Sequence, residues 1–103
     1  MDEAVNFTLY LSARAVMELK EAAEYYAKMS HSVNDRFGII IERTLLSIAN
    51  NPLAYAIRYG TMRCAVIHEF PYVIHFELEE RTGIIRVTSI FNTYRNPADR
   101  PKD

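Results

Sequence analysis

The side chains of this chain that are best suited to chemistry lie in its last third. A predicted strand ends at Phe91 and runs into a polar cluster at residues 92–97, with the sequence NTYRNP. No hydrophobic core requires these residues, and a small domain commonly keeps its chemistry or its contacts where a strand ends. Arginine is also the side chain of choice for bidentate contact with phosphate or carboxylate. The cluster is therefore the first candidate for a functional site.

Two histidines and the single cysteine lie in or beside predicted strands of the same region. A histidine on a strand is more often a hydrogen-bonded structural side chain than an acid–base catalyst, and we interpret His68 and His75 in that way. We interpret Cys64 as a small core residue. One cysteine excludes an internal disulfide, and three scattered histidines lack the spacing of metal ligands. The sequence therefore predicts neither a metal ion nor a cofactor.

Composition narrows the class of protein. The chain has 103 residues and is 50% hydrophobic, which favours one domain over residues 1–103 with a single core. No apolar run approaches the roughly 20 residues of a membrane span, and the acidic N-terminus is unlike a signal peptide. We therefore expect a cytoplasmic protein without membrane contact. A net charge of −1 is also unlike the basic surface of a general nucleic-acid binder.

The first half of the chain predicts a strand followed by a helix. Apolar and polar residues alternate from Val5 to Leu11, as in a half-buried strand. Ser12 then stands where an N-cap belongs, and helical spacing of apolar residues continues from Ala13 to about Met29. The solvated face of this helix is expected to carry Glu18, Glu21 and Glu24.

A second helix follows after a short break. Ser32, with Asp35 three residues later, predicts its N-terminal cap. The helix must end before Pro52, because the residue preceding a proline is disfavoured in the helical conformation. Ile39 and Leu46 lie beside the main apolar stripe, where they either widen the core or form a patch for a partner. So short a break predicts an antiparallel helical hairpin.

The second half predicts three strands after a loop at residues 52–61. The strands cover residues 62–69, 72–79 and 84–91, and turn residues between them indicate an antiparallel meander. The fold class is α+β, in the order β-α-α-β-β-β, with the helical hairpin packed on one face of a mainly antiparallel sheet. The tail at residues 98–103, with its proline and charges, is expected to fray.

The sheet face opposite the helices has no predicted element to cover it. By alternation, we expect it to carry Arg63, Ala65 and Ile67 from one strand and His75 and Glu77 from the next. An uncovered face that is concave is the default place for a binding site.

Short motifs accompany these elements in a fixed order. They are Leu11-Ser12-Ala13-Arg14-Ala15, Ala23-Glu24-Tyr25-Tyr26, Asn51-Pro52, Arg63, Phe70-Pro71-Tyr72-Val73-Ile74 and Arg95-Asn96-Pro97. Together, their order and spacing resemble the RelE/ParE superfamily of bacterial type II toxins. The resemblance extends from Phe7 to about Pro97, and so covers nearly the whole chain.

The resemblance implies a growth-inhibiting toxin of a plasmid-stabilising toxin–antitoxin system, held inactive by a cognate antitoxin. Members of the superfamily either inhibit DNA gyrase or cleave mRNA on the ribosome. By resemblance, Arg63 and Arg95 would contact the target or stabilise charge on a scissile phosphate, and Tyr94 would donate a proton. Asn92 stands where many relatives carry a histidine, and an amide cannot transfer protons as an imidazole does.

Three functional hypotheses follow from the resemblance. Asn92, the lack of lysine between Lys28 and Lys102, and the acidic net charge favour a ParE-like, non-nucleolytic growth inhibitor. One alternative is a RelE-like ribosome-dependent mRNA endonuclease, the case in which the chain would be an enzyme. The other is a degenerate, non-toxic binding module. The resemblance also leaves open that the chain forms a homodimer.

Overall fold

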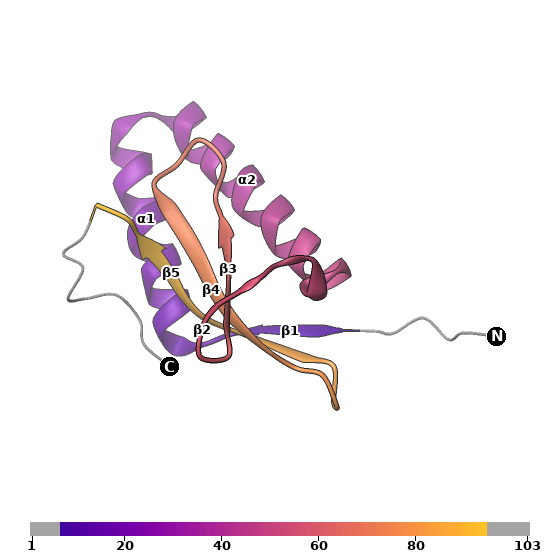
Figure 1. The fold of residues 1–103 in the computed structure, drawn as a ribbon. Coiled ribbons are helices and arrows are strands. Elements are labelled where there is room, and N and C mark those ends of the chain that lie inside the picture. Colours follow the sequence, from indigo (N-terminus) through magenta and orange to yellow (C-terminus); the bar gives the residue numbers. More distant parts are fainter. Residues whose placement is uncertain (1–6, 95–103) are drawn as a thin grey trace.

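Two helices lie against one face of a five-stranded sheet in the computed structural model, which describes residues 7–94 (Figure 1). Arg95 and the tail predicted to fray are outside the described residues. The α+β class and the helical hairpin on one sheet face are confirmed. In chain order the elements are β1 (Thr8–Leu11), α1 (Ala13–Met29), α2 (His31–Asn50), the 3₁₀ helix η1 (Pro52–Ala54), β2 (Ile57–Tyr59), β3 (Met62–Val66), β4 (Tyr72–Glu79) and β5 (Ile84–Asn92).

The strands are arranged in the order β1-β5-β4-β3-β2. β1 runs parallel to β5, and the other neighbours are antiparallel, so the predicted meander is present. The prediction of a loop at residues 52–61 is wrong in part, because these residues contain η1 and β2. β2 forms a tight hairpin with β3 through Gly60, whose positive φ of 51° favours glycine. With three residues, β2 is too short to produce a recognisable alternation.

Serine side chains cap both helices. Ser12 Oγ accepts a hydrogen bond from Ala15 N at 3.0 Å, as predicted for α1. The predicted cap of α2 is wrong: Ser30 Oγ, not Ser32, accepts from Val33 N at 3.1 Å. Ser30 has an extended backbone, and this single residue separates the helices, so α2 begins at His31 and Ser32 lies inside it. The helix ends at Asn50, before Pro52, as expected.

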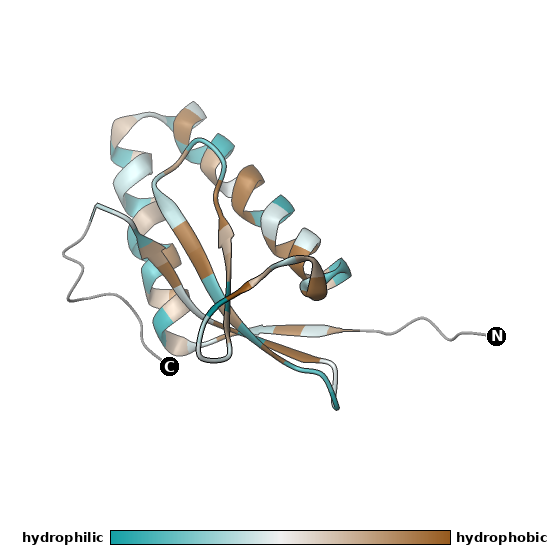
Figure 2. Ribbon diagram, viewed as in Figure 1, coloured by the Kyte–Doolittle hydropathy of each residue, from teal (hydrophilic) through white to brown (hydrophobic). Residues whose placement is uncertain are grey.

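The sheet face that packs on the helices differs from the prediction. In the β3–β4 register Arg63 lies opposite Phe76 and Ala65 opposite Ile74. Residues opposite each other share a face, and Phe76 and Ile74 are fully buried in the core with the helices. Arg63, Ala65 and Ile67 therefore point toward the helices, and their predicted place on the uncovered face is wrong. Apolar residues are prominent along α2, β4 and β5, which enclose this core (Figure 2).

A β-bulge sets the direction of the end of β5. The β4–β5 register shifts between His75 and Phe76, so that Phe76 pairs with Val87 but His75 pairs with Ser89. Glu18 of α1 supports the shift, because its carboxylate accepts from Ser89 Oγ at 2.7 Å and from Ile90 N at 2.9 Å. Its predicted place on a solvated face is wrong, since the side chain is only 11% exposed. The bulge turns Ile90 into the core.

Candidate functional site

The end of β5 brings two of the predicted site residues together. Asn92 pairs with Tyr72 at the start of β4, and its Oδ1 accepts a hydrogen bond from Tyr94 N at 2.9 Å. Thr93 N donates to Pro71 O at 2.8 Å, which fixes the chain as it leaves the sheet. The side chain of Tyr94 is 86% exposed. Asn92 and Tyr94 thus form an ordered, accessible end, which is followed in sequence by Arg95.

A pocket of about 420 Å³ separates this end from α1. Its walls include Tyr25 and Tyr26 of α1 and Tyr72 of β4. Burial raises the pKa of the Tyr26 phenol, which also hydrogen-bonds Tyr72, above its ordinary value of 10.0. This tyrosine is therefore neutral at physiological pH. The full lining is Glu18, Glu21, Ala22, Tyr25, Tyr26, Met29, Pro71, Tyr72, Ile90, Asn92 and Tyr94.

Arg63 lies elsewhere and makes a structural contact. The half-buried guanidinium donates from Nη1 to the backbone oxygen of Tyr55 at 2.6 Å. Tyr55 in turn shares a hydrogen bond with Ser47 of α2 at 2.7 Å and packs edge-on against Phe76. Arg63 thus holds the segment after η1 against the sheet. We call this arrangement of Arg63, Tyr55 and Ser47 the loop anchor.

The loop anchor and the end of β5 are far apart on the sheet. Arg63 pairs with Phe76, in the middle of β4, whereas Asn92 pairs with Tyr72, its first residue. This offset along β4 corresponds to about 13 Å at the usual rise of a strand. They also lie on strands on either side of β4. The structure therefore brings Asn92 and Tyr94 together but places Arg63 in a separate region.

The uncovered face carries a cluster that the sequence did not indicate. His75 is only 4% exposed, and its Nδ1 lies 2.8 Å from Tyr59 Oη and 3.6 Å from Cys64 Sγ. Thr88 Oγ1 donates to the His75 backbone oxygen at 3.2 Å, and the Phe91 ring stands edge-on to the imidazole. The interpretation of His75 as a hydrogen-bonded structural residue is confirmed. Cys64 is half-buried beside it rather than inside the main core.

The remaining candidate histidine lies on the β3–β4 loop. His68 is exposed, and its neighbour Glu69 accepts two hydrogen bonds from the Arg36 guanidinium of α2, at 2.8 and 2.6 Å. These bonds lower the pKa of the Glu69 carboxyl and raise that of Arg36. Glu69 has a φ of 73°, which is uncommon for a residue other than glycine. The ion pair thus ties a strained turn to α2.

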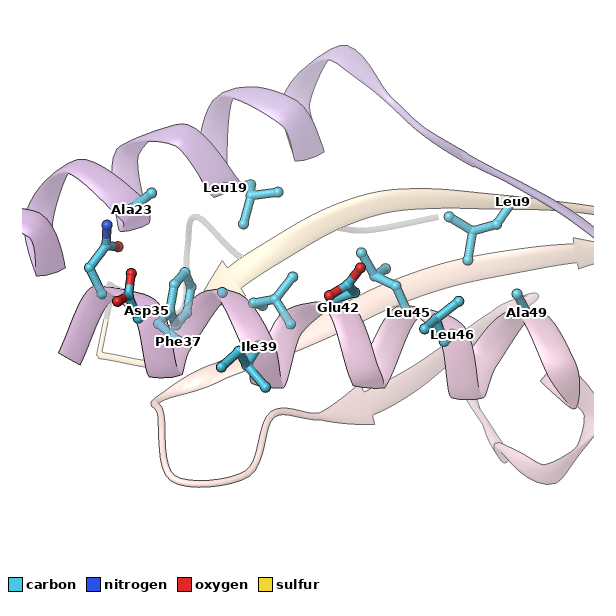
Figure 3. Close-up of a pocket in the computed structure, with 13 residues that line it drawn as sticks. Leu9, Leu19, Ala23, Asp35, Phe37, Ile39, Glu42, Leu45, Leu46 and Ala49 are labelled. Atoms are coloured by element: carbon cyan, nitrogen blue, oxygen red, sulfur yellow. The ribbon is translucent and has the colours of Figure 1, made fainter. Parts of the chain in front are cut away.

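An apolar groove of about 880 Å³ runs between α1 and α2 and reaches β1 (Figure 3). Leu19 and Leu45 point into it from the two helices, and Leu9 lines it from β1 (Figure 3). Ile39 and Leu46 lie along it and are 49% and 57% exposed. The sequence left open whether Ile39 and Leu46 widen the core or form a patch for a partner. Their exposure favours the patch.

Two other properties concern the described part of the chain. Within residues 7–94 neither helix combines the length and the apolarity needed to cross a bilayer. The same residues contain no group of three or more His, Cys, Asp or Glu side chains placed to hold a metal ion.

The fold, a helical hairpin on one face of a mixed sheet, is shared with a solved bacterial structure. It matches a structure titled "Chromosomal ParDE TA system from P. aeruginosa" with a TM-score of 0.71 and 12% sequence identity. The match covers 84% of this chain and 95% of that one. At this identity the likeness establishes the fold.

The sequence places the chain in a family. The model of the family described as "ParE toxin of type II toxin-antitoxin system, parDE" matches residues 9–97, so the chain belongs to this family. It is the toxin component of a type II toxin–antitoxin system, and the family implies an antitoxin partner. A comparison with curated proteins finds no match.

Proposed function

We propose that this toxin acts in the cytoplasm by binding a protein target, DNA gyrase, through the end of β5. The observation that carries the proposal is the match to the ParE toxin family over residues 9–97. The proposed contact consists of Tyr94 and Arg95, with Asn92 holding Tyr94 through its backbone nitrogen. Exposed aromatic and arginine side chains are typical anchors of protein–protein interfaces.

The placement of acid–base groups favours a protein target over RNA cleavage. An mRNA endonuclease needs cationic and proton-transferring groups around one phosphate. Among residues 7–94, Arg63 is in the loop anchor and His68 is on the β3–β4 loop. His75 is buried, on the sheet face that the helices do not cover. In the register of the sheet, Arg63 pairs with Phe76 and His75 pairs with Ser89, so neither of them pairs with Asn92. A direct role for Arg63 at the target stays a prediction; here we assign it the loop anchor.

We propose that the antitoxin covers the groove between α1 and α2. The groove exposes Ile39 and Leu46, which an apolar helix face would bury. Asp35 and Glu42 line it as well, so basic residues beside that apolar face would be complementary. Co-expression of the cognate antitoxin should restore growth with the wild-type toxin and fail to do so with an Ile39→Glu, Leu46→Glu variant. The matched control is Val66→Glu, which changes a side chain 71% exposed on the opposite sheet face.

The target is tested by inducing the chain alone in its bacterial host. Wild type should arrest growth, and purified protein should inhibit DNA supercoiling by gyrase while transcripts in a translating extract stay intact. Tyr94→Ala and Arg95→Ala should each relieve the arrest. Controls of the same residue types are Tyr10→Ala, on the exposed edge strand β1, and Arg81→Ala, in the exposed β4–β5 turn.

Each contrary outcome identifies another function. Cleaved transcripts with normal supercoiling would establish the RelE-like endonuclease. Unaffected growth, together with tight binding of the antitoxin, would establish the non-toxic binding module.

A further inference from the structure

A separate pocket lies between α2 and the β3–β4 loop, on the side of the helix away from α1 (Figure 3). Its volume is about 500 Å³, and its lining is rich in basic groups, with Arg36 and Arg43 from α2 and His68 from the loop. We call it the loop pocket. Ile39 lines both this pocket and the groove between α1 and α2, so the two adjoin across the exposed surface of α2.

The exposed surface of α2 separates its charges by sign. Asp35 and Glu42 line the groove, whereas Arg36 and Arg43 line the loop pocket. Residues seven apart lie at nearly the same angle around a helix, so each pair forms a row along α2. Ile39 lies between the two rows and is 49% exposed. A partner that covers Ile39 therefore meets negative charge on one side and positive charge on the other.

The two arginines of the loop pocket differ in their electrostatic surroundings. Arg36 donates two hydrogen bonds to Glu69, so these two charges balance each other. Arg43 is exposed, and within residues 7–94 it takes part in no ion pair. No residue three or four positions from Arg43 along the helix is charged. The Arg43 guanidinium is therefore the unbalanced charge of the pocket, and an arginine beside exposed apolar side chains is a typical anchor of an interface.

We propose that the loop pocket binds an acidic side chain of the antitoxin. The carboxylate pairs with the Arg43 guanidinium through two hydrogen bonds, and His68 supplies a further donor from the loop. Apolar residues beside that acidic side chain cover Ile39 and continue the contact into the groove. The proposal rests on the docking of the antitoxin on α2 proposed above.

This contact fixes the direction in which the antitoxin segment lies. A segment turned end for end would bring its basic residues to Arg43 and its acidic residues to Asp35 and Glu42. Both flanks would then place like charges together, which disfavours the reversed arrangement. The two rows of charge thus select one orientation, whereas Ile39 alone would accept either.

Calorimetric titration of the full chain with its cognate antitoxin tests the pocket. Arg43→Gln should weaken binding about fivefold to fiftyfold, because it leaves the carboxylate of the antitoxin without its charged partner. Arg43→Lys should recover part of this loss, since an ammonium lacks the planar fork of arginine. The matched control is Arg81→Gln, exposed in the β4–β5 turn, which should bind as wild type does. Wild-type affinity in Arg43→Gln, or a loss of affinity accompanied by a lowered urea midpoint, would overturn the proposal.

A charge exchange identifies the acidic residue. Arg43→Glu should weaken binding more than Arg43→Gln does. One Asp or Glu of the antitoxin, changed to Lys, should then restore at least about tenfold of the lost affinity, and its other acidic residues, changed in the same way, are the controls. If none of these changes restores binding, Arg43 does not meet a carboxylate and the proposal is wrong.

Leu46→Ser separates the loop pocket from the groove, because Leu46 lines the groove and is not among the residues of the loop pocket. Weaker binding in Leu46→Ser but not in Arg43→Gln would overturn the loop pocket and leave the groove. Weaker binding in Arg43→Gln alone would support the acidic contact and refute the groove. Sedimentation of the toxin alone tests a different occupant: a toxin dimer that Arg43→Gln dissociates would overturn the proposal in favour of a second copy of this chain.

Discussion

The loop anchor and the end of β5 each contain a tyrosine, Tyr55 and Tyr94, and these two side chains are in opposite situations. In the loop anchor, the Arg63 guanidinium and the Tyr55 hydroxyl both bond within the chain, to a backbone oxygen and to Ser47. At the end of β5, the side chain of Tyr94 is 86% exposed, and its backbone nitrogen donates to Asn92 Oδ1. The first region stabilises the fold, and the second is the region that we propose presents side chains to a partner.

The comparison shows that the contacts of a side chain, more than its chemical type, indicate its role. Replacing residues in the loop anchor should lower stability, whereas replacing Tyr94 should change function at nearly constant stability. The end of β5 nevertheless has a support of its own, because Glu18 holds the bulge beneath it. Variants can therefore separate three roles: supporting the end of β5, anchoring the loop and contacting the target.

The largest loss of stability is expected from Glu18→Ala. It leaves Ser89 Oγ and Ile90 N without their acceptor in a buried place, which costs about 2–4 kcal/mol of unfolding free energy. Glu18→Gln retains an acceptor oxygen and should lose less than half of that. Urea denaturation measures both, with Glu24→Ala as a surface control. A cost within 0.5 kcal/mol, roughly that of a surface substitution, would mean that the bulge needs no support from α1.

Arg63→Ala should have the next largest effect on stability. Loss of the charge-assisted bond to the Tyr55 backbone oxygen should lower the unfolding free energy by about 1.5–3 kcal/mol. Arg63→Lys should recover part of this loss. If Arg63→Ala abolishes growth inhibition while the urea midpoint is unchanged, Arg63 contacts the target and the comparison of the two regions fails.

Tyr94→Ala should leave the free energy of unfolding within about 0.5 kcal/mol of wild type, because the exposed ring buries little surface. Growth inhibition should nevertheless be lost. Measuring the urea midpoint and the growth curve for the same variant sharpens the comparison. A fall in stability as large as that expected for Arg63→Ala would show that Tyr94 stabilises the fold, as the loop anchor does.

The smallest effect concerns the Arg36–Glu69 ion pair, which depends on pH. Arg36 lowers the pKa of Glu69 in the folded state, so the pair stabilises the fold above the unfolded pKa. This contribution is lost as pH falls through the lowered folded pKa. Glu69→Gln should therefore lower the urea midpoint slightly at pH 7, and this difference should shrink as the pH falls below the unfolded pKa of Glu69. Glu80→Gln, exposed in the β4–β5 turn, should show no such difference. A midpoint difference that persists at low pH would mean that Glu69 stabilises the fold by something other than its charge.

The predictable part of the fold came from local patterns. Ser12 and Pro52 set one end each of α1 and α2, because a cap and a proline act on the backbone beside them. Strict alternation gave β4 its full length from Tyr72 to Glu79. The motif order also pointed to the toxin superfamily, and the family match over residues 9–97 agrees with it. At the site, Asn92 and Tyr94 were placed together because they are neighbours in sequence.

What the sequence could not determine depended on contacts between distant segments. Alternation shows that Arg63 and Cys64 face opposite ways, but only pairing with β4 decides which of them meets the helices. The bulge that turns Ile90 inward is bonded to Glu18, more than seventy residues earlier. Tyr59 and His75 meet only because β2 joins the sheet. The sequence by itself determined the elements and the family; the tertiary structure decided which side chains are available, because register and burial arise only when the elements pack.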